Sequence, residues 1–136
     1  HYKEKKDNKI LVILSGKRRD FLINELDKLG INYLYKEMVD LKTVNELYNI
    51  LDLYIVSSRF EGGPQSVLEC AITKTPIIST DVGLASSVLS SSSIFDMNNY
   101  KTAVPDTDYA YKRVEDFKLI KSMPRYIKML EYAFES

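Results

Sequence analysis

The sequence predicts an α/β fold in which helices cover both faces of a parallel β-sheet. Short, continuous apolar runs alternate with segments whose apolar residues recur at helical spacing. The runs are apolar throughout and not only at every second position, which is typical of strands buried on both faces. A length of 136 residues, 45% of them hydrophobic, is enough for one domain with a core. The sheet should be parallel because strands that alternate with helices are joined by crossover connections.

Five apolar runs are expected to form the strands of this sheet. The run KILVILS is the clearest of them, since it is short, apolar and followed by a glycine. The runs LYIVSS and PIIST lie on either side of a Gly-Gly-Pro turn, and SIFD is the shortest. The expected strands are residues 9–15, 31–37, 53–58, 76–80 and 93–96.

The helices between these strands have start and stop signals. Gly30 should end the first helix, because glycine readily adopts the left-handed conformation of a helix end. Asp40 is expected to cap the second helix. Pro64 should occupy the first position of the third, where a missing N–H group costs little. The expected helices are residues 19–30, 40–51, 63–73, 84–90, 107–119 and 124–134.

Composition argues against several classes of function. Lys and Arg balance Asp and Glu at 19 each, so net charge does not attract nucleic acid or a membrane surface. No apolar run approaches the roughly 20 residues that a membrane helix needs. Cys70 stands alone, which excludes an internal disulfide and a site with several cysteine ligands. The sole histidine, His1, lies at the chain end, which argues against histidine-based catalysis.

Ligands of such sheets bind in the crevice at the carboxyl ends of the strands. The loops expected there are residues 16–18, 38–40, 59–64 and 81–83. Lys17 and Arg18 follow the first strand, where they could neutralise a phosphate group. A solvated helix start is the alternative, because basic residues are common on protein surfaces.

The loop after the third strand leads into a helix start that suits an anion. A helix beginning at Pro64 leaves the N–H groups of Gln65 and Ser66 free. The positive end of a helix dipole makes such groups a ready phosphate site. Gly62 and Gly63 let a ligand approach the backbone closely. The pattern therefore favours a diphosphate at this turn.

Two glutamates flank this turn at a spacing of eight. Glu69 shares a helix face with Gln65 and Ser66, about 4.5 Å further along the axis, where it could accept from two ribose hydroxyls. Glu61 precedes the turn and would meet the group that hangs from the diphosphate. The spacing fits a nucleoside diphosphate that carries a further group. A plain turn, with Glu69 solvated or in a salt bridge, is the alternative that spacing alone leaves open.

The stretch FEGGPQSVLECAITKTPIISTDVG resembles the nucleotide-sugar signature of family 4 glycosyltransferases, the glycosyl transferases group 1. These are retaining enzymes of the GT-B fold. Their pattern is a glutamate, seven residues and a second glutamate, followed by A…G.P(V/I)I.TDVGG, and Glu61 and Glu69 match the two acids. ELYNILDLYIVSSRFEG is similar to the family's LY..aD.fv.pS..EG, and LVILSGKRRDFLINELDKLGI to its second strand and helix.

The resemblance implies a Rossmann-like parallel sheet flanked by helices, the C-terminal half of a GT-B fold. Residues 1–136 would form one nucleotide-sugar-binding domain, truncated at its N-terminal side, with a helical tail at 107–136. The family's first strand and helix of this half, with a basic pair, are absent, as is the N-terminal acceptor domain. The missing strand is central. The five strands should therefore either close up in the order 2-1-3-4-5, or leave a gap that another segment fills.

The resemblance also implies roles for individual residues. Glu69 would bind the ribose, and Glu61 would be the catalytic group beside the transferred sugar. The diphosphate would be held by the helix start, and Lys17 and Arg18 would help to neutralise it. Two positions depart from the pattern: Pro64 removes one amide, and Leu84 stands where a second glycine is common. The full set of expected donor-binding residues is Glu69, Gly62, Gly63, Gln65, Ser66, Val39 near the base, Lys17 and Arg18.

The resulting expectation is the donor-binding domain of a retaining glycosyltransferase of the hexosyltransferase type. Its partners would be a nucleotide sugar and, through the missing domain, a glycan or lipid-linked acceptor, in bacterial surface polysaccharide synthesis. No nucleic acid, metal or other cofactor is expected. A cytoplasmic location follows, with peripheral membrane association of the longer protein. The alternatives are a non-catalytic binding module for a nucleotide or sugar phosphate, and a nucleotide-sugar epimerase of the same fold.

Overall fold

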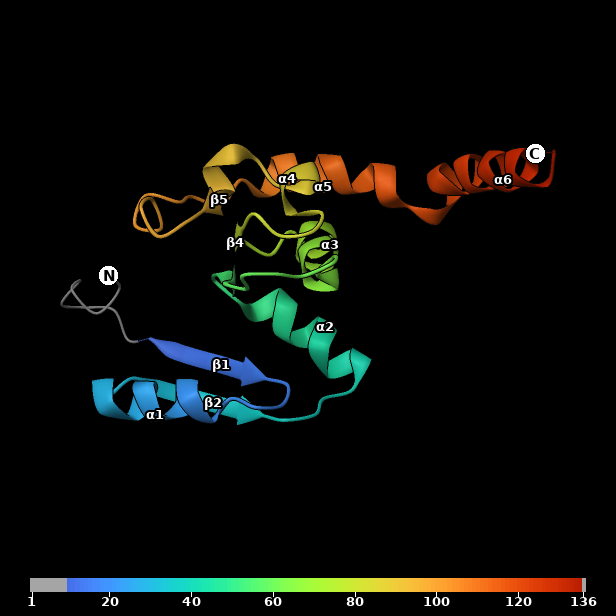
Figure 1. Cartoon of the computed structure of the whole chain (residues 1–136). Coiled ribbons are helices and arrows are strands. Elements are labelled where there is room, and N and C mark those ends of the chain that lie inside the picture. The colour runs from blue at the N-terminus through green and yellow to red at the C-terminus, as the bar shows by residue number, and fades with distance from the viewer. Residues whose placement is uncertain (1–9, 136) are drawn as a thin grey trace. The chain divides into compact units, whose positions relative to one another are not determined.

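The computed structural model describes residues 10–135, in which strands and helices alternate along the chain (Figure 1). Its internal contacts divide the chain into two compact units, His1–Glu46 (unit 1) and Leu47–Ser136 (unit 2). Each unit is an α/β arrangement with parallel strands, and each is described by itself. The α/β fold class predicted from the sequence is confirmed.

Unit 1 contains a two-stranded parallel sheet with a helix between its strands. β1 pairs with β2 from Leu11 opposite Asn32 to Ser15 opposite Lys36. The predicted helix signals are confirmed. Gly30 ends α1 in the left-handed conformation, with φ of 60°. Asp40 precedes α2, and its carboxylate accepts a 2.7 Å hydrogen bond from the Thr43 N–H group, which lowers the Asp40 pKa. The elements are β1 (Leu11–Ser15), α1 (Asp20–Leu29), β2 (Asn32–Lys36) and α2 (Leu41–Ile50), which continues into unit 2.

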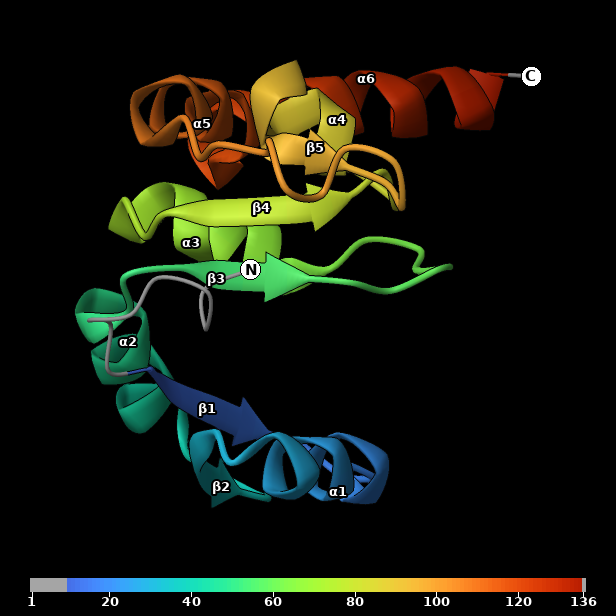
Figure 2. The ribbon, with the colours of Figure 1, turned by 90° about the vertical axis from the view of Figure 1, so that its left-hand side faces the viewer.

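Unit 2 is built on a three-stranded parallel sheet in the order β3-β4-β5, visible in Figure 2. Its central strand β4 pairs with both neighbours. The helices α3 and α5 contact each other, and α3 also packs on β4. The elements are β3 (Tyr54–Val56), α3 (Gln65–Thr73), β4 (Ile77–Thr80), α4 (Ala85–Val88), η2 (Ser91–Ser93), β5 (Ile94–Phe95), α5 (Thr107–Val114), η3 (Glu115–Phe117) and α6 (Leu119–Glu135).

The core of unit 2 lies where α3, α4 and α5 meet the sheet. Its apolar side chains include Val67 and Cys70 on α3, Ile77 on β4 and Val88 on α4, all of which are buried. The buried Ser93 hydroxyl donates to the Val104 carbonyl, so burial leaves it with a partner. This core fixes β4 and α3, the two elements from which the candidate site below is built.

The strand neighbours within each sheet are those expected. β2 lies beside β1 in unit 1, and β3, β4 and β5 follow one another in unit 2. The described strands thus form one sheet in each unit, and the closed order 2-1-3-4-5, which would join β1 to β3, is not found among them.

Several helix boundaries differ from the sequence prediction. The helix expected at 107–119 is divided into α5, η3 and the first residue of α6, and two other differences involve proline. Pro64 is the N-cap residue of α3, with ψ of 113°, and the helix begins one residue later at Gln65. Pro124 lies inside α6, which begins at Leu119. The Lys118 carbonyl accepts from the Ser122 N–H group at 3.0 Å and from its hydroxyl at 3.1 Å. These bonds fix the first turn, so the helix forms ahead of the proline.

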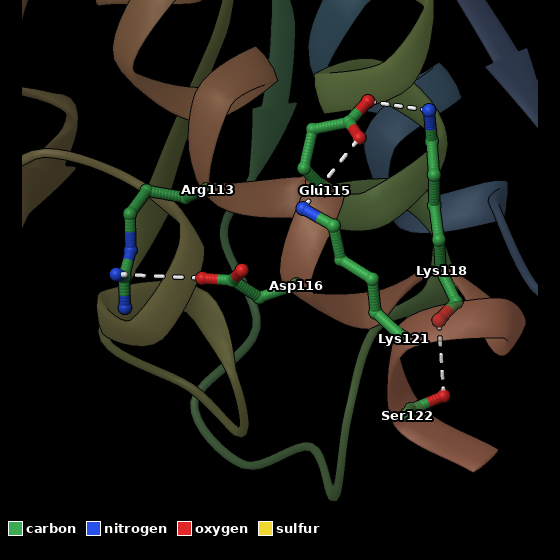
Figure 3. Close-up of polar contacts among 6 residues, drawn as sticks. All are labelled: Arg113, Glu115, Asp116, Lys118, Lys121 and Ser122. Atoms are coloured by element: carbon green, nitrogen blue, oxygen red, sulfur yellow. Dashed lines mark hydrogen bonds and ion pairs between the residues drawn. The ribbon is translucent and has the colours of Figure 1, made fainter. Parts of the chain in front are cut away.

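Charged side chains surround the junction between α5 and α6 (Figure 3). Glu115 forms an ion pair with Lys118 and a longer one, at 3.9 Å, with Lys121. The hydrogen bond and charge of Lys118 lower the pKa of the Glu115 carboxyl. Arg113 pairs with Asp116 at 3.8 Å. Because these groups are exposed or, for Glu115, half-buried, we assign them a role in shaping the junction and only a small share of stability.

Lys74 offers a test of backbone strain at the end of α3. This residue has φ of 57°, in the left-handed region that favours glycine. Its ammonium group pairs with Asp108 at 3.3 Å and lies 4.6 Å from the centre of the Tyr111 ring. Lys74→Gly and Lys74→Ala both lose these contacts, but only glycine relieves the strain. The glycine variant should therefore be more stable than the alanine variant by about 1 kcal/mol in urea unfolding. Equal stabilities would contradict this account.

Candidate functional site

The loops that follow β3 and β4 leave the sheet of unit 2 at the same end (Figure 2). The Thr80 hydroxyl at the end of β4 donates to the Ser58 carbonyl after β3, at 2.6 Å, and so joins the two strand ends. Between the loops lies an open pocket with a volume of about 480 Å³. Its lining residues are Arg59, Phe60, Glu61, Gly62, Asp81, Val82 and Gly83. The pocket therefore lies at the carboxyl end of the strands, where the sequence predicts a ligand.

The two loops are in close contact through their glycines. Gly83 has φ of 54°, and a Cβ atom on it would lie 2.8 Å from the Cα and nitrogen atoms of Gly63 and 3.0 Å from the carbonyl carbon of Gly62. No other residue type fits between two backbones at this distance. The Gly62-Gly63 turn is thus held by the Gly83 loop as well as by its own chain neighbours.

The start of α3 presents the amide groups that the sequence predicts. Pro64 is buried and has no N–H group, and its carbonyl accepts from the Val67 N–H group at 3.1 Å. Gln65 and Ser66 occupy the first two helical positions, whose N–H groups have no partner within a helix. Gln65 is exposed and Ser66 is half-buried. The shift of Pro64 to the N-cap thus leaves the predicted pair of amides in place.

Glu61 and Glu69, the two acids of the signature, lie in different environments. Glu61 is exposed and lines the pocket. Glu69 is half-buried on α3, and its Oε2 atom accepts a 2.7 Å hydrogen bond from the Tyr48 hydroxyl. The sequence predicts Glu69 as a ribose ligand, with a solvated or salt-bridged side chain as the alternative, and the structure adds a hydrogen-bond partner for one of its oxygens.

Tyr48 is a residue beside the candidate site that the sequence analysis did not identify. Its side chain is 8% exposed, and its ring centre lies 5.6 Å from that of Tyr54. Burial, followed by the hydrogen bond to Glu69, raises the pKa of Tyr48 far above its usual range. The residue type could have indicated this contact, because a tyrosine on the apolar face of a helix needs a hydrogen-bond partner for its hydroxyl.

Tyr54 and Ser66 extend this polar cluster toward the helix start. Burial raises the pKa of Tyr54, and hydrogen bonds with the side chains of Ser66 and Tyr48 partly offset that effect. Cys70, next to Glu69, is fully buried, and burial raises its thiol pKa to about 12. The thiol is therefore protonated near neutral pH, which fits the expected packing role and not a reactive one.

The remaining predicted donor-binding residues belong to unit 1. Lys17 and Arg18 follow β1 and are exposed, and Val39 follows β2 and is half-buried. The Gly16 N–H group donates to the Glu37 carbonyl at 3.1 Å, which brings these two loops together at one edge of the sheet. Arg18 has φ of 60°, a strained conformation for arginine. The structure thus gathers these residues at the expected strand ends of their own unit.

Two kinds of feature are absent from the described residues. Residues 10–135 contain no group of three or more His, Cys, Asp or Glu side chains that could hold a metal ion. No helix in the same range is long and apolar enough to cross a membrane.

Comparison with protein families identifies the chain. Residues 1–129 match the model of the glycosyl transferases group 1. The chain belongs to this family. A search of curated proteins gave no match. Membership confirms the resemblance and indicates a glycosyltransferase-type function. Glu61 and Glu69 therefore lie in a glycosyltransferase domain. The Gly62-Gly63 loop connects the pocket that Glu61 lines to the start of α3.

Proposed function

We propose that this group 1 glycosyltransferase domain binds the donor, a nucleoside diphosphate sugar, of a retaining hexosyltransferase. The observation that carries the proposal is the placement of three groups in a row. Along the chain, Glu61, which lines the pocket, precedes the Gly-Gly turn. The amides of Gln65 and Ser66 follow the turn, and Glu69 lies one helical turn further along α3. Sugar, diphosphate and ribose follow one another in the same order in such a donor.

The start of α3 suits the diphosphate in this proposal. The amides of Gln65 and Ser66, together with the helix dipole, favour negative charge. The bare backbone of Gly62 and Gly63 allows the phosphate oxygens to approach closely. These fixed dipoles would stabilise the charge that develops on the leaving diphosphate, so the proposal requires no metal ion.

Glu61 is the proposed catalytic group. It lines the pocket beside Arg59 and Asp81, next to the turn that would hold the diphosphate. Positive charge develops on the sugar ring as a glycosidic bond breaks, and a carboxylate at this position would stabilise it. The retained anomeric configuration is inferred from the family, and this role of Glu61 is compatible with it.

The family resemblance also assigns donor-binding roles to three residues of unit 1, Lys17, Arg18 and Val39. The cationic side chains of Lys17 and Arg18 would neutralise phosphate, arginine by paired hydrogen bonds. The backbone at Val39 would meet the base. The acceptor, a glycan or a lipid-linked sugar, would bind to another domain, as in the family. We place the whole enzyme in the cytoplasm, in bacterial surface polysaccharide synthesis, with peripheral attachment to the membrane.

The first test is calorimetric titration of the 136-residue chain with UDP, GDP and their sugar derivatives. We expect one base to bind, and Glu69→Ala to weaken that binding by at least about 1 kcal/mol, the size of a lost hydrogen bond. Glu131→Ala on exposed α6 is the matched control and should bind like the wild type. Thermal unfolding of each variant separates a lost contact from a lost fold.

The same titration distinguishes the proposed function from that of an epimerase. The chain should bind a nucleotide sugar and leave it unchanged, because transfer needs the acceptor. Conversion of the sugar to its epimer would favour the epimerase instead. Absence of nucleotide binding, both here and in any longer protein that contains this chain, would refute the proposal.

A further inference from the structure

Tyr48 has two hydrogen bonds, one from its hydroxyl to α3 and one from the segment after α3 to its backbone. The hydroxyl donates to Glu69 at 2.7 Å, and the Tyr48 carbonyl accepts from the buried Thr75 hydroxyl at 2.8 Å. The Thr73 and Thr75 hydroxyls lie 2.7 Å apart, and Thr73 donates to the Glu69 carbonyl at 2.7 Å. Each hydroxyl has one proton, so the contact between the two threonines and their bonds to the carbonyls cannot all form at once. The two direct bonds of Tyr48, to the Glu69 carboxylate and from the Thr75 hydroxyl, restrict the position of its side chain.

The aromatic neighbour of Tyr48 restricts it further. The Tyr48 and Tyr54 rings lie 5.6 Å apart and are tilted by 54°. Tyr48 is 8% exposed, so its ring has little room to rotate. Because the Tyr48 hydroxyl has a restricted position, its hydrogen bond also restricts the Glu69 carboxylate that accepts it. A glutamate side chain on a helix surface otherwise samples several rotamers, which it must give up on binding a ligand.

The hydrogen bond from Tyr48 occupies only part of the Glu69 carboxylate. It uses Oε2, whereas a carboxylate has about four acceptor positions on its two oxygens. Oε1 and the second position on Oε2 therefore remain for a ligand. Two vicinal hydroxyls, such as the 2′- and 3′-hydroxyls of ribose, need two such positions.

We propose that Tyr48 is a positioning residue that holds the Glu69 carboxylate ready for a vicinal diol, and thereby makes the site selective for ribose. The inference rests on the proposed donor site. It adds that ribose selectivity depends on a residue outside the two-glutamate signature, which acts through Glu69 and does not touch the ligand. Such pre-organisation strengthens binding because the carboxylate is already ordered.

The test compares Tyr48→Phe with the wild type on two ligands, the nucleoside diphosphate that binds and its 2′,3′-dideoxy form. The phenylalanine variant keeps the ring but loses the hydroxyl. We expect it to bind the ribonucleotide about five- to tenfold more weakly, the effect of one lost hydrogen bond. The dideoxy ligand should bind equally to both proteins, because it makes no use of Glu69. Tyr109→Phe on α5, where the tyrosine is exposed, is the matched control and should change neither affinity.

A double-mutant cycle shows whether Tyr48 acts through Glu69. Added to Glu69→Gln, Tyr48→Phe should cause less than about a twofold further loss of ribonucleotide affinity, because coupled residues are not additive. If Tyr48→Phe does not fold, Thr75→Ala replaces it. That variant frees the Tyr48 carbonyl and should also lower the ratio of ribonucleotide to dideoxynucleotide affinity.

The outcomes separate this inference from the proposed function. Equal weakening of both ligands, additive losses in the cycle, or an unchanged affinity ratio would overturn the role of Tyr48 and leave the donor site standing. A wild-type protein that binds no nucleotide would remove the donor site, and this inference with it.

Discussion

Replacing Gly83 by alanine should destabilise unit 2 by about 2–5 kcal/mol. Two costs combine. A non-glycine residue in the left-handed region costs about 1–2 kcal/mol, and Gly83 has φ of 54°. The new methyl group would also lie 2.8 Å from the Cα and nitrogen atoms of Gly63, and overpacking of this kind costs about 1–3 kcal/mol. Because the opposing atoms belong to the backbone, no side-chain rotation can relieve the contact. Urea unfolding followed by circular dichroism measures the change.

Gly62→Ala is the matched control for this prediction. A Cβ atom at Gly62 meets no atom within 4 Å, and this glycine does not have a positive φ. Alanine there should leave stability unchanged or raise it by about 0.4–1 kcal/mol, because it restricts the unfolded chain. Similar losses in the two variants would contradict the close contact between the two loops. Gly83→Ala should also weaken nucleotide binding in the proposed site, since relief of the contact requires the turn before α3 to move.

The elements of the fold were predictable because each is encoded locally. The apolar run of β4, the glycine that ends α1 and the aspartate that caps α2 act within a few residues of themselves. Boundaries at proline were less predictable. Pro64 and Pro124 both suit several positions near a helix start, and hydrogen bonds of neighbouring residues decide among them.

Only the part of the candidate site that lies on a single helix could be predicted from the sequence. Glu69, Gln65 and Ser66 are neighbours on α3, so their order follows from helical geometry. The partner of Glu69 is Tyr48, on a different helix and 21 positions away in the chain. Likewise, the contact of Gly83 with Gly63 joins two loops separated by a helix and a strand. Such pairs form through tertiary packing, which cannot be read directly from a single sequence.

Alkaline pH should destabilise the protein through the buried groups behind the site. Burial, followed by the charge of Glu69, raises the Cys70 pKa from its ordinary value of about 9 to about 12. The Tyr48 pKa is raised far above its ordinary value of about 10. Above these ordinary values the unfolded chain loses its protons first, so it binds fewer protons than the folded protein. The free energy of unfolding must then fall as pH rises, by up to about 1.4 kcal/mol per pH unit for each group.

The stabilisation from Cys70 is complete below about pH 9 and is lost progressively as pH rises toward 12. At pH 11 the loss from Cys70 should exceed that from Tyr48, because the ordinary pKa of a thiol lies below that of a phenol. Urea unfolding at pH 8, 9.5 and 11, with a reductant present, measures the slope. Cys70→Ala should flatten it from pH 9 upward, and Tyr48→Phe only above pH 10. Tyr109→Phe should keep the wild-type slope, because its hydroxyl lies on an exposed side chain. A slope that is the same in all four proteins would mean that neither the thiol nor the Tyr48 phenol is protected by the fold.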